Sequence, residues 1–157
     1  TADTYLPLRE DCVSQGVMAP VAKTPFDFRA PKYIGKDIDA DNEQIHRAHG
    51  YDHCFCIDGY TPQGEPRLAF LATGTKAELT ILLTTPGAHF YTGNWLGDIN
   101  AKDGAVYGPN DGFAFEPEFY PDFIHHPSWS QSCCDADHPY IESIVYRIRP
   151  REEPMRA

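Results

Sequence analysis

Two glutamates separated by a single proline, Glu116 and Glu118, are the side chains of this sequence best suited to acid–base chemistry. They lie in the segment 112–120, whose aromatic residues predict a β-strand. Because side chains alternate across a strand, both carboxylates would point to one face and the phenylalanines to the other. Pro117 has no N–H to donate, so we expect the strand at a sheet edge or a bulge. The same pattern also fits a solvated polar face, or the carboxylate pair of a glycosidase.

A second group of reactive side chains occupies the segment 46–56, which contains three histidines and two cysteines. Imidazole and thiolate are ligands of zinc. In a strand, however, His53 and Cys54 would point to opposite faces, and Cys54 and Cys56 lack the two-residue spacing of a zinc turn. We therefore predict no bound metal and no cofactor. Two interpretations stay open, namely loop histidines beside a buried Cys56, or a substrate-binding role for Asp52 or His53.

A third segment, 84–95, runs as a strand into Pro-Gly and restarts with His89 and two aromatic residues. Aromatic rings stack on sugar faces, and His or Asn side chains bond hydroxyl groups. This pattern is typical of a pocket wall, although a buried core strand would have the same residues.

The elements that must position these side chains are β-strands, since apolar residues at helical spacing are almost absent. Segments rich in β-branched and aromatic residues, each bounded by turn residues, predict six strands. These are Cys54–Asp58, Arg67–Thr73, Ala77–Thr85, His89–Thr92, Gly112–Tyr120 and Ile141–Ile148. Residues 2–8 also have a strand-like pattern, whereas 11–41 reads as a long connection with one or two short strands. Short strands with regular turns favour an all-β, antiparallel sandwich.

Length and charge limit the kind of partner. The 157 residues fit one globular domain, and 23 acidic against 13 basic residues give a formal charge of −10. Without a basic patch we expect no nucleic acid and no membrane as partner, and a neutral ligand fits better. The five cysteines are a poor disulfide framework, so we read them mostly as thiols. They leave the compartment open, with the cytoplasm slightly favoured over secretion.

Five segments together resemble the aldose 1-epimerase (galactose mutarotase) family, in the family's own order. The family patterns are ADxYLPxD, VxGTPFDFR, GYDHNF, PGVQFYTGN and GFCLETQxxPDxxNHP. The matching segments of this sequence are Ala2–Leu8, Val21–Arg29, Gly50–Phe55, Pro86–Asn94 and Gly112–Pro127.

The resemblance implies a large antiparallel β-sandwich that binds free hexoses, such as glucose or galactose, and interconverts their α and β anomers without a cofactor. Glu116 falls on the family's general base. Asp52 falls on a carboxylate that holds sugar hydroxyls, and His89 on a position, usually Gln, that also touches the sugar. A sugar-binding sandwich without catalysis is the alternative.

This sequence also departs from the family pattern. The family's general acid is a histidine in an NHxYFNL segment, which should lie before residue 1, so residues 1–157 are expected to form the C-terminal part of one sandwich domain. They would supply the base but not the acid. We expect such a chain to be inactive alone, and a separate N-terminal polypeptide or a dimer partner to complete it. Position 89 carries His instead of Gln, and position 118 carries Glu instead of Gln.

Overall fold

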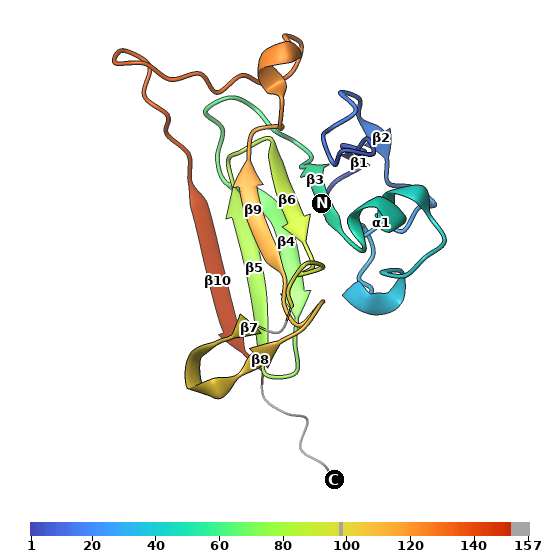
Figure 1. The fold of residues 1–157 in the computed structure, drawn as a ribbon. Coiled ribbons are helices and arrows are strands. Elements are labelled where there is room, and N and C mark those ends of the chain that lie inside the picture. Colours follow the sequence, from blue (N-terminus) through green and yellow to red (C-terminus); the bar gives the residue numbers. More distant parts are fainter. Residues whose placement is uncertain (98, 152–157) are drawn as a thin grey trace.

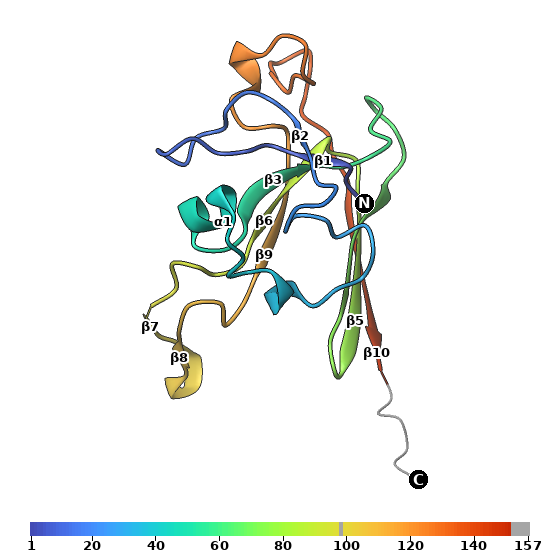
Figure 2. The ribbon, with the colours of Figure 1, turned by 90° about the vertical axis from the view of Figure 1, so that its right-hand side faces the viewer.

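The computed structural model describes residues 1–97 and 99–151, and its regular structure is mainly antiparallel β-sheet. A five-stranded sheet has the order β2-β1-β3-β6-β9, and a three-stranded sheet has the order β10-β5-β4. The two sheets form two layers, shown from the front in Figure 1 and from the side in Figure 2. The first contains β1 (Thr4–Tyr5), β2 (Ala19–Pro20), β3 (Asp52–Cys56), β6 (Gly87–Tyr91) and β9 (Ala114–Glu118). The second contains β4 (Arg67–Thr73), β5 (Ala77–Leu83) and β10 (Ile144–Pro150).

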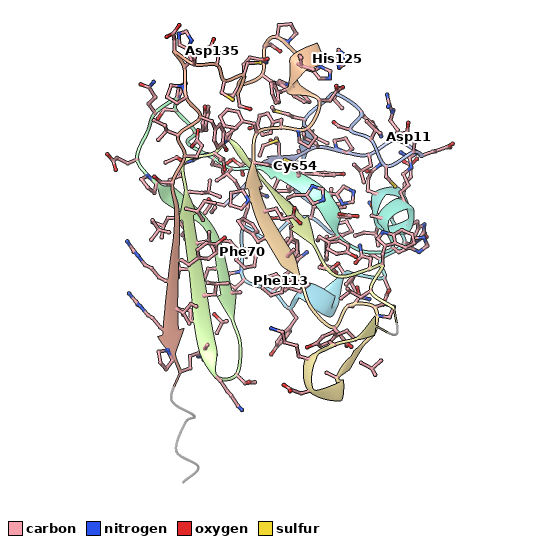
Figure 3. All side chains as sticks on the ribbon, turned by 60° about the vertical axis from the view of Figure 1, so that its left-hand side comes forward. Asp11, Cys54, Phe70, Phe113, His125 and Asp135 are labelled. Atoms are coloured by element: carbon pink, nitrogen blue, oxygen red, sulfur yellow. The ribbon has the colours of Figure 1, made fainter. Side chains whose placement is uncertain are left out.

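Aromatic side chains fill the space between the two layers. Phe70 of β4 lies with its ring centroid 4.6 Å from Phe115 and 5.8 Å from Phe90, and 5.6 Å from Phe113. Figure 3 shows Phe70 and Phe113 in this position. These contacts come from one face of β6 and β9, so the opposite face of the five-stranded sheet is free to carry polar residues.

The N-terminal segment extends the same apolar core over β3. Phe26 is fully buried, stacks on Tyr5 at 4.2 Å between centroids, and meets the edge of Tyr51 and His53. The long connection that supplies Phe26 contains one short strand, β2, as its sequence predicted, and the short 3-10 helix η1 (Ile34–Lys36), which was not predicted.

One short helix, α1 (Glu43–Ala48), precedes β3. The side chain of Asn42 accepts hydrogen bonds from the backbone N–H groups of Gln44 and Ile45, which satisfies two free donors of the first turn. The helix ends where His49 takes the left-handed conformation, followed by Gly50. This arrangement leads the chain directly into β3, where Asp52 begins the strand.

The remaining elements lie outside the two main sheets. They are β7 (Ile99–Asn100), β8 (Val106–Tyr107), η2 (Lys102–Gly104) and η3 (Phe123–His125). Across residues 1–97 and 99–151, no helix is both long and apolar enough to cross a bilayer.

The predicted all-β antiparallel sandwich is confirmed, and each of the six predicted strands is present. Their ends differ by up to three residues, and β3 begins two residues earlier than predicted, which brings Asp52 into the strand. The helix α1 and the small β7–β8 ladder were not predicted. A helix of six residues is too short to show an apolar stripe, and tertiary packing stabilises it instead.

Candidate active site

The three side chains expected to form the site come together on one face of the five-stranded sheet. Asp52 lies on β3, His89 on β6 and Glu116 on β9. In the strand register His89 lies directly opposite Cys54 on one side and Glu116 on the other. We call this surface the site face, defined by Asp52, Cys54, His89, Glu116 and Glu118.

The opposite face of the same strands is apolar, which fixes the orientation of the site face. The next row in the register consists of His53, Phe90 and Phe115, and all three pack toward the sandwich interior. His53 is fully buried, and burial lowers its pKa to about 3. The structure thus excludes His53 as a substrate-binding group and identifies it as a neutral histidine of the core.

His89 is the best-connected residue of the site face. Its Nε2–H donates to Asp52 Oδ1 at 2.7 Å, and its Nδ1 lies 3.6 Å from Glu118 Oε1. Burial would lower the pKa of His89, but the hydrogen bonds and negative charges of Asp52 and Glu118 outweigh it and raise this pKa to about 9. At neutral pH the ring is therefore an imidazolium held between two carboxylates.

Glu116 is exposed and belongs to the edge strand β9, as Pro117 indicated. Directly opposed residues of an antiparallel pair have Cβ atoms roughly 4.5–5.5 Å apart. The side chain of Glu116 therefore leaves its strand next to the side chain of His89, and it is open to solvent. A carboxylate in this position can take a proton from a ligand that lies on the site face.

A pocket of about 580 Å³ opens next to the site face. Small-molecule sites commonly have volumes of roughly 300–1,000 Å³, so this space has the size of a small-molecule site. His89 and Cys54 contribute to its wall, and the rest of the lining comes from two loops: Leu6, Leu8, Arg9, Cys12, Val13 and Ser14, and Pro121, Asp122 and His125. Asp52 and Glu116 are not among its lining residues, so the pocket adjoins the predicted triplet rather than enclosing it.

Buried thiols form the apolar base of the site face. Cys54 and Cys56 pack with Leu6 and Tyr120, and burial raises the pKa of both thiols. All five cysteines are free, and Cys12 is exposed on the pocket wall. Among the residues that the structure describes, no three His, Cys, Asp or Glu side chains are grouped so that they could hold a metal ion.

Two members of the site face could not be assigned a place from the sequence. The alternation of residues 112–120 placed Glu118 beside Glu116, but only the pairing of β9 with β6 shows that Glu118 contacts His89. Cys54 was considered as a zinc ligand, whereas the register puts it directly opposite His89. Strand partners are distant in the chain, so no local pattern could have revealed either contact.

Comparison with known proteins gives one consistent result. A family model described as aldose 1-epimerase matches residues 1–146. The galactose mutarotase of Rattus norvegicus is 38% identical over 130 residues, which are 82% of this chain and 36% of the rat protein. The aldose 1-epimerase of Escherichia coli (strain K12) is 35% identical over 133 residues, which are 85% of this chain and 38% of that protein.

Solved structures show the same relationship. A crystal structure described as an aldose epimerase homologue from C. elegans superposes with a TM-score of 0.77 at 26% identity, covering 96% of this chain and 44% of that one. A galactose 1-epimerase from Lactobacillus acidophilus gives a TM-score of 0.72 at 27% identity, with 96% and 42% covered. This chain thus spans less than half the length of the relatives that it matches.

Proposed function

Because this chain belongs to the aldose 1-epimerase family, we propose that it carries the general base and part of the sugar-binding surface of a mutarotase. The substrate is a free hexose such as glucose or galactose, and the products are its α and β anomers. The observation that supports this proposal is the exposed Glu116, placed directly opposite a His89 that is hydrogen-bonded to Asp52.

The reaction needs one base and one acid. Glu116 removes the proton of the anomeric hydroxyl while a proton is delivered to the ring oxygen, so the bond between the anomeric carbon and the ring oxygen breaks and the open-chain aldehyde forms. Rotation about the bond next to the carbonyl, followed by the reverse proton transfers, closes the ring as the other anomer. No net proton is gained or lost.

Asp52 and His89 would hold the sugar during these steps. Oδ1 of Asp52 accepts the hydrogen bond from His89, which leaves Oδ2 as an acceptor for a sugar hydroxyl. A carboxylate whose rotamer is fixed by a charged donor binds with less loss of conformational entropy. His89 adds a positive charge to a surface that otherwise carries three carboxylates.

We further propose that residues 1–157 are the C-terminal part of one sandwich domain, and that the general acid comes from protein outside this chain, either a separate polypeptide or a dimer partner. The strand β10 supports this division. Its residues Tyr146 and Ile148 lie opposite the buried Ile81 and the half-buried Leu79 of β5, yet they are 55% and 71% exposed. An apolar row of this kind is typical of a surface that another part of a protein covers.

Polarimetry of freshly dissolved α-glucose and α-galactose tests the proposed activity, with the protein that contains this sequence. We expect Glu116→Gln to lower the rate of anomerisation by about 10²- to 10⁴-fold, the usual contribution of a general base. Glu65→Gln, a change of an exposed glutamate in a loop outside the site face, is the matched control and should keep the full rate. An undiminished rate in the Glu116 variant would remove this residue as the base.

The second candidate is a carbohydrate-binding sandwich without catalysis, which the position of Glu116 outside the walls of the adjoining pocket favours. Calorimetry separates the two functions. Saturable binding of galactose or glucose, combined with no acceleration of anomerisation by the complete protein, would support the binding module and refute the mutarotase.

A further inference from the structure

The contacts of His89 with two carboxylates constrain its protonation state by geometry. Nε2 faces Asp52 Oδ1 at 2.7 Å and Nδ1 faces Glu118 Oε1 at 3.6 Å. A neutral imidazole has one N–H, so it would direct a lone pair at one of these oxygens. Only the imidazolium can present a proton to both. The imidazolium therefore donates a hydrogen bond to Asp52 and places its positive charge beside Glu118 Oε1.

The buried position of the Glu118 carboxylate makes it depend on the positive charge of the His89 ring. Its Oε1 atom is buried and has no hydrogen-bond partner within the described part of the chain. A buried carboxylate oxygen without a partner is unfavourable unless an opposite charge lies nearby. The imidazolium of His89 supplies that charge, and Glu118 in turn stabilises the protonated ring.

The strand register explains why His89 reaches both carboxylates. Asp52 lies opposite Tyr91 and Glu118 lies opposite Gly87, so each carboxylate is the diagonal neighbour of His89, one toward each end of β6. Diagonal neighbours are within reach of long side chains. A Cβ on Gly87 would lie 2.9 Å from the Cys54 sulfur and 3.0 Å from the Tyr120 ring, so this position has room only for glycine.

We propose that Glu118 is a positioning residue, which acts through the His89 ring to fix the Asp52 carboxylate in the orientation that receives a sugar hydroxyl. This proposal rests on the sugar-binding function proposed above. In this role Glu118 acts on the His89 ring rather than on the sugar, so the orientation of Asp52 depends on the proton of His89.

Several other groups surround the ring and have to be considered in its titration. Asp52 and Cys54 face it from β3, Glu116 and Glu118 from β9, and Asp122 and His125 line the adjoining pocket. The Cys54 thiol has a pKa far above its ordinary value because it is buried, so it stays uncharged. The carboxylates favour the protonated ring, and Glu118 is one of the two in direct contact with it.

The first experiment measures the proton of His89 directly and does not depend on activity. The chemical shifts of the His89 ring are followed by NMR as a function of pH in the unmodified protein and in Glu118→Gln, and the midpoint of each titration is determined. Loss of the charge at position 118 should lower this midpoint by about one pH unit, a tenfold change in proton affinity. The control variant Glu65→Gln should leave it in place. An unchanged midpoint in Glu118→Gln would overturn the proposal.

The second experiment tests whether the proton of His89 serves sugar binding. In Glu118→Gln the KM for galactose should rise about tenfold above the new midpoint, because one hydrogen bond to a charged group is weakened, while kcat falls less. The double variant His89→Gln/Glu118→Gln replaces the charged pair with two amides. Its KM should no longer change between pH 6 and pH 10.

The outcomes separate this proposal from the proposed function. A loss of kcat in Glu118→Gln as large as that in Glu116→Gln, at unchanged KM, would make Glu118 a participant in the proton transfers and would overturn a positioning role. If the unmodified protein does not anomerise sugars, the mutarotase fails, and calorimetric affinity for galactose replaces KM. Affinity that does not follow the His89 midpoint would then overturn the positioning role.

Discussion

Acidification should destabilise the folded protein through His53, the fully buried histidine of the core. Its ring packs 4.6 Å from Phe26, and its Nδ1 accepts a hydrogen bond from the backbone N–H of Asp52. Burial lowers the pKa of His53 from 6.5 to about 3, with the positive charge of His89 acting in the same direction and Asp52 against it. The folded protein thus keeps this ring neutral in conditions where an unfolded chain would protonate it.

The sign and size of this loss of stability follow from the difference between the pKa of His53 in the folded protein and in the unfolded chain. Between pH 6.5 and about 3 the unfolded chain binds one proton more than the folded protein at this residue. The contribution of the neutral His53 to the free energy of unfolding is therefore fully present above pH 6.5 and is lost as the pH falls below it. One proton changes the free energy of unfolding by ~1.4 kcal/mol per pH unit, so acidification from pH 6.5 to 4.5 should cost roughly 2–3 kcal/mol. That is a substantial share of the ~5–15 kcal/mol typical of a folded domain.

Urea denaturation at a series of pH values measures this loss. Carboxylates contribute to the same slope, so the test compares the protein with His53→Gln, which has no titrating ring, and with His46→Gln, in which an exposed histidine is changed. We expect a shallower pH dependence in His53→Gln and an unaltered one in His46→Gln. Parallel curves for all three proteins, or an NMR signal of His53 that titrates near pH 6.5, would refute the reasoning.

Three substitutions away from the site face test the packing. Phe26→Ala should lower the free energy of unfolding by ~3–5 kcal/mol in urea titrations, because it removes a fully buried ring. Gly50→Ala should lower the melting temperature by several degrees, since Gly50 has a φ of +137° and a Cβ there would lie 2.6 Å from Asn94 Oδ1. Gly35→Ala, where a Cβ meets no atom within 4 Å, is its control and should melt close to the parent protein. Asn42→Ala should cost about 1 kcal/mol in urea titrations by removing the cap of α1, and no change there would contradict the capping role.

The strands were predictable because their signals are local. Alternation in the segment 112–120 gave the two faces of β9, and Pro117 gave its place at the edge of the sheet. The helix α1 was missed because six residues carry too little periodicity, although the Asn42 cap was present in the sequence. Predicted strand ends were less accurate than the strands themselves, as for Asp52, which lies inside β3.

The candidate site was predictable from family resemblance, but its internal contacts were not. Asp52, His89 and Glu116 were each placed by a matching motif, and the structure brings them to one face. The ion pair of His89 with Glu118 depends on the register of β6 against β9, which brings together residues that are 29 positions apart. Long-range register is set by turns and by the packing of whole faces, so neither residue's local surroundings contain it.

The strand β10 has a consequence for handling the isolated chain. It pairs with β5 along seven residues and forms the end of its sheet in the described structure, so one row of its backbone groups faces outward. Such an edge can pair with a strand from a second copy of the chain, and the exposed side chains of Tyr146 and Ile148 would add apolar contact area to that interface. Arg147 and Arg149 lie within the strand and Pro150 at its end, and their charges and the missing N–H of the proline oppose the addition of further strands. Dilute solutions should therefore keep preparations clear for longer than concentrated ones.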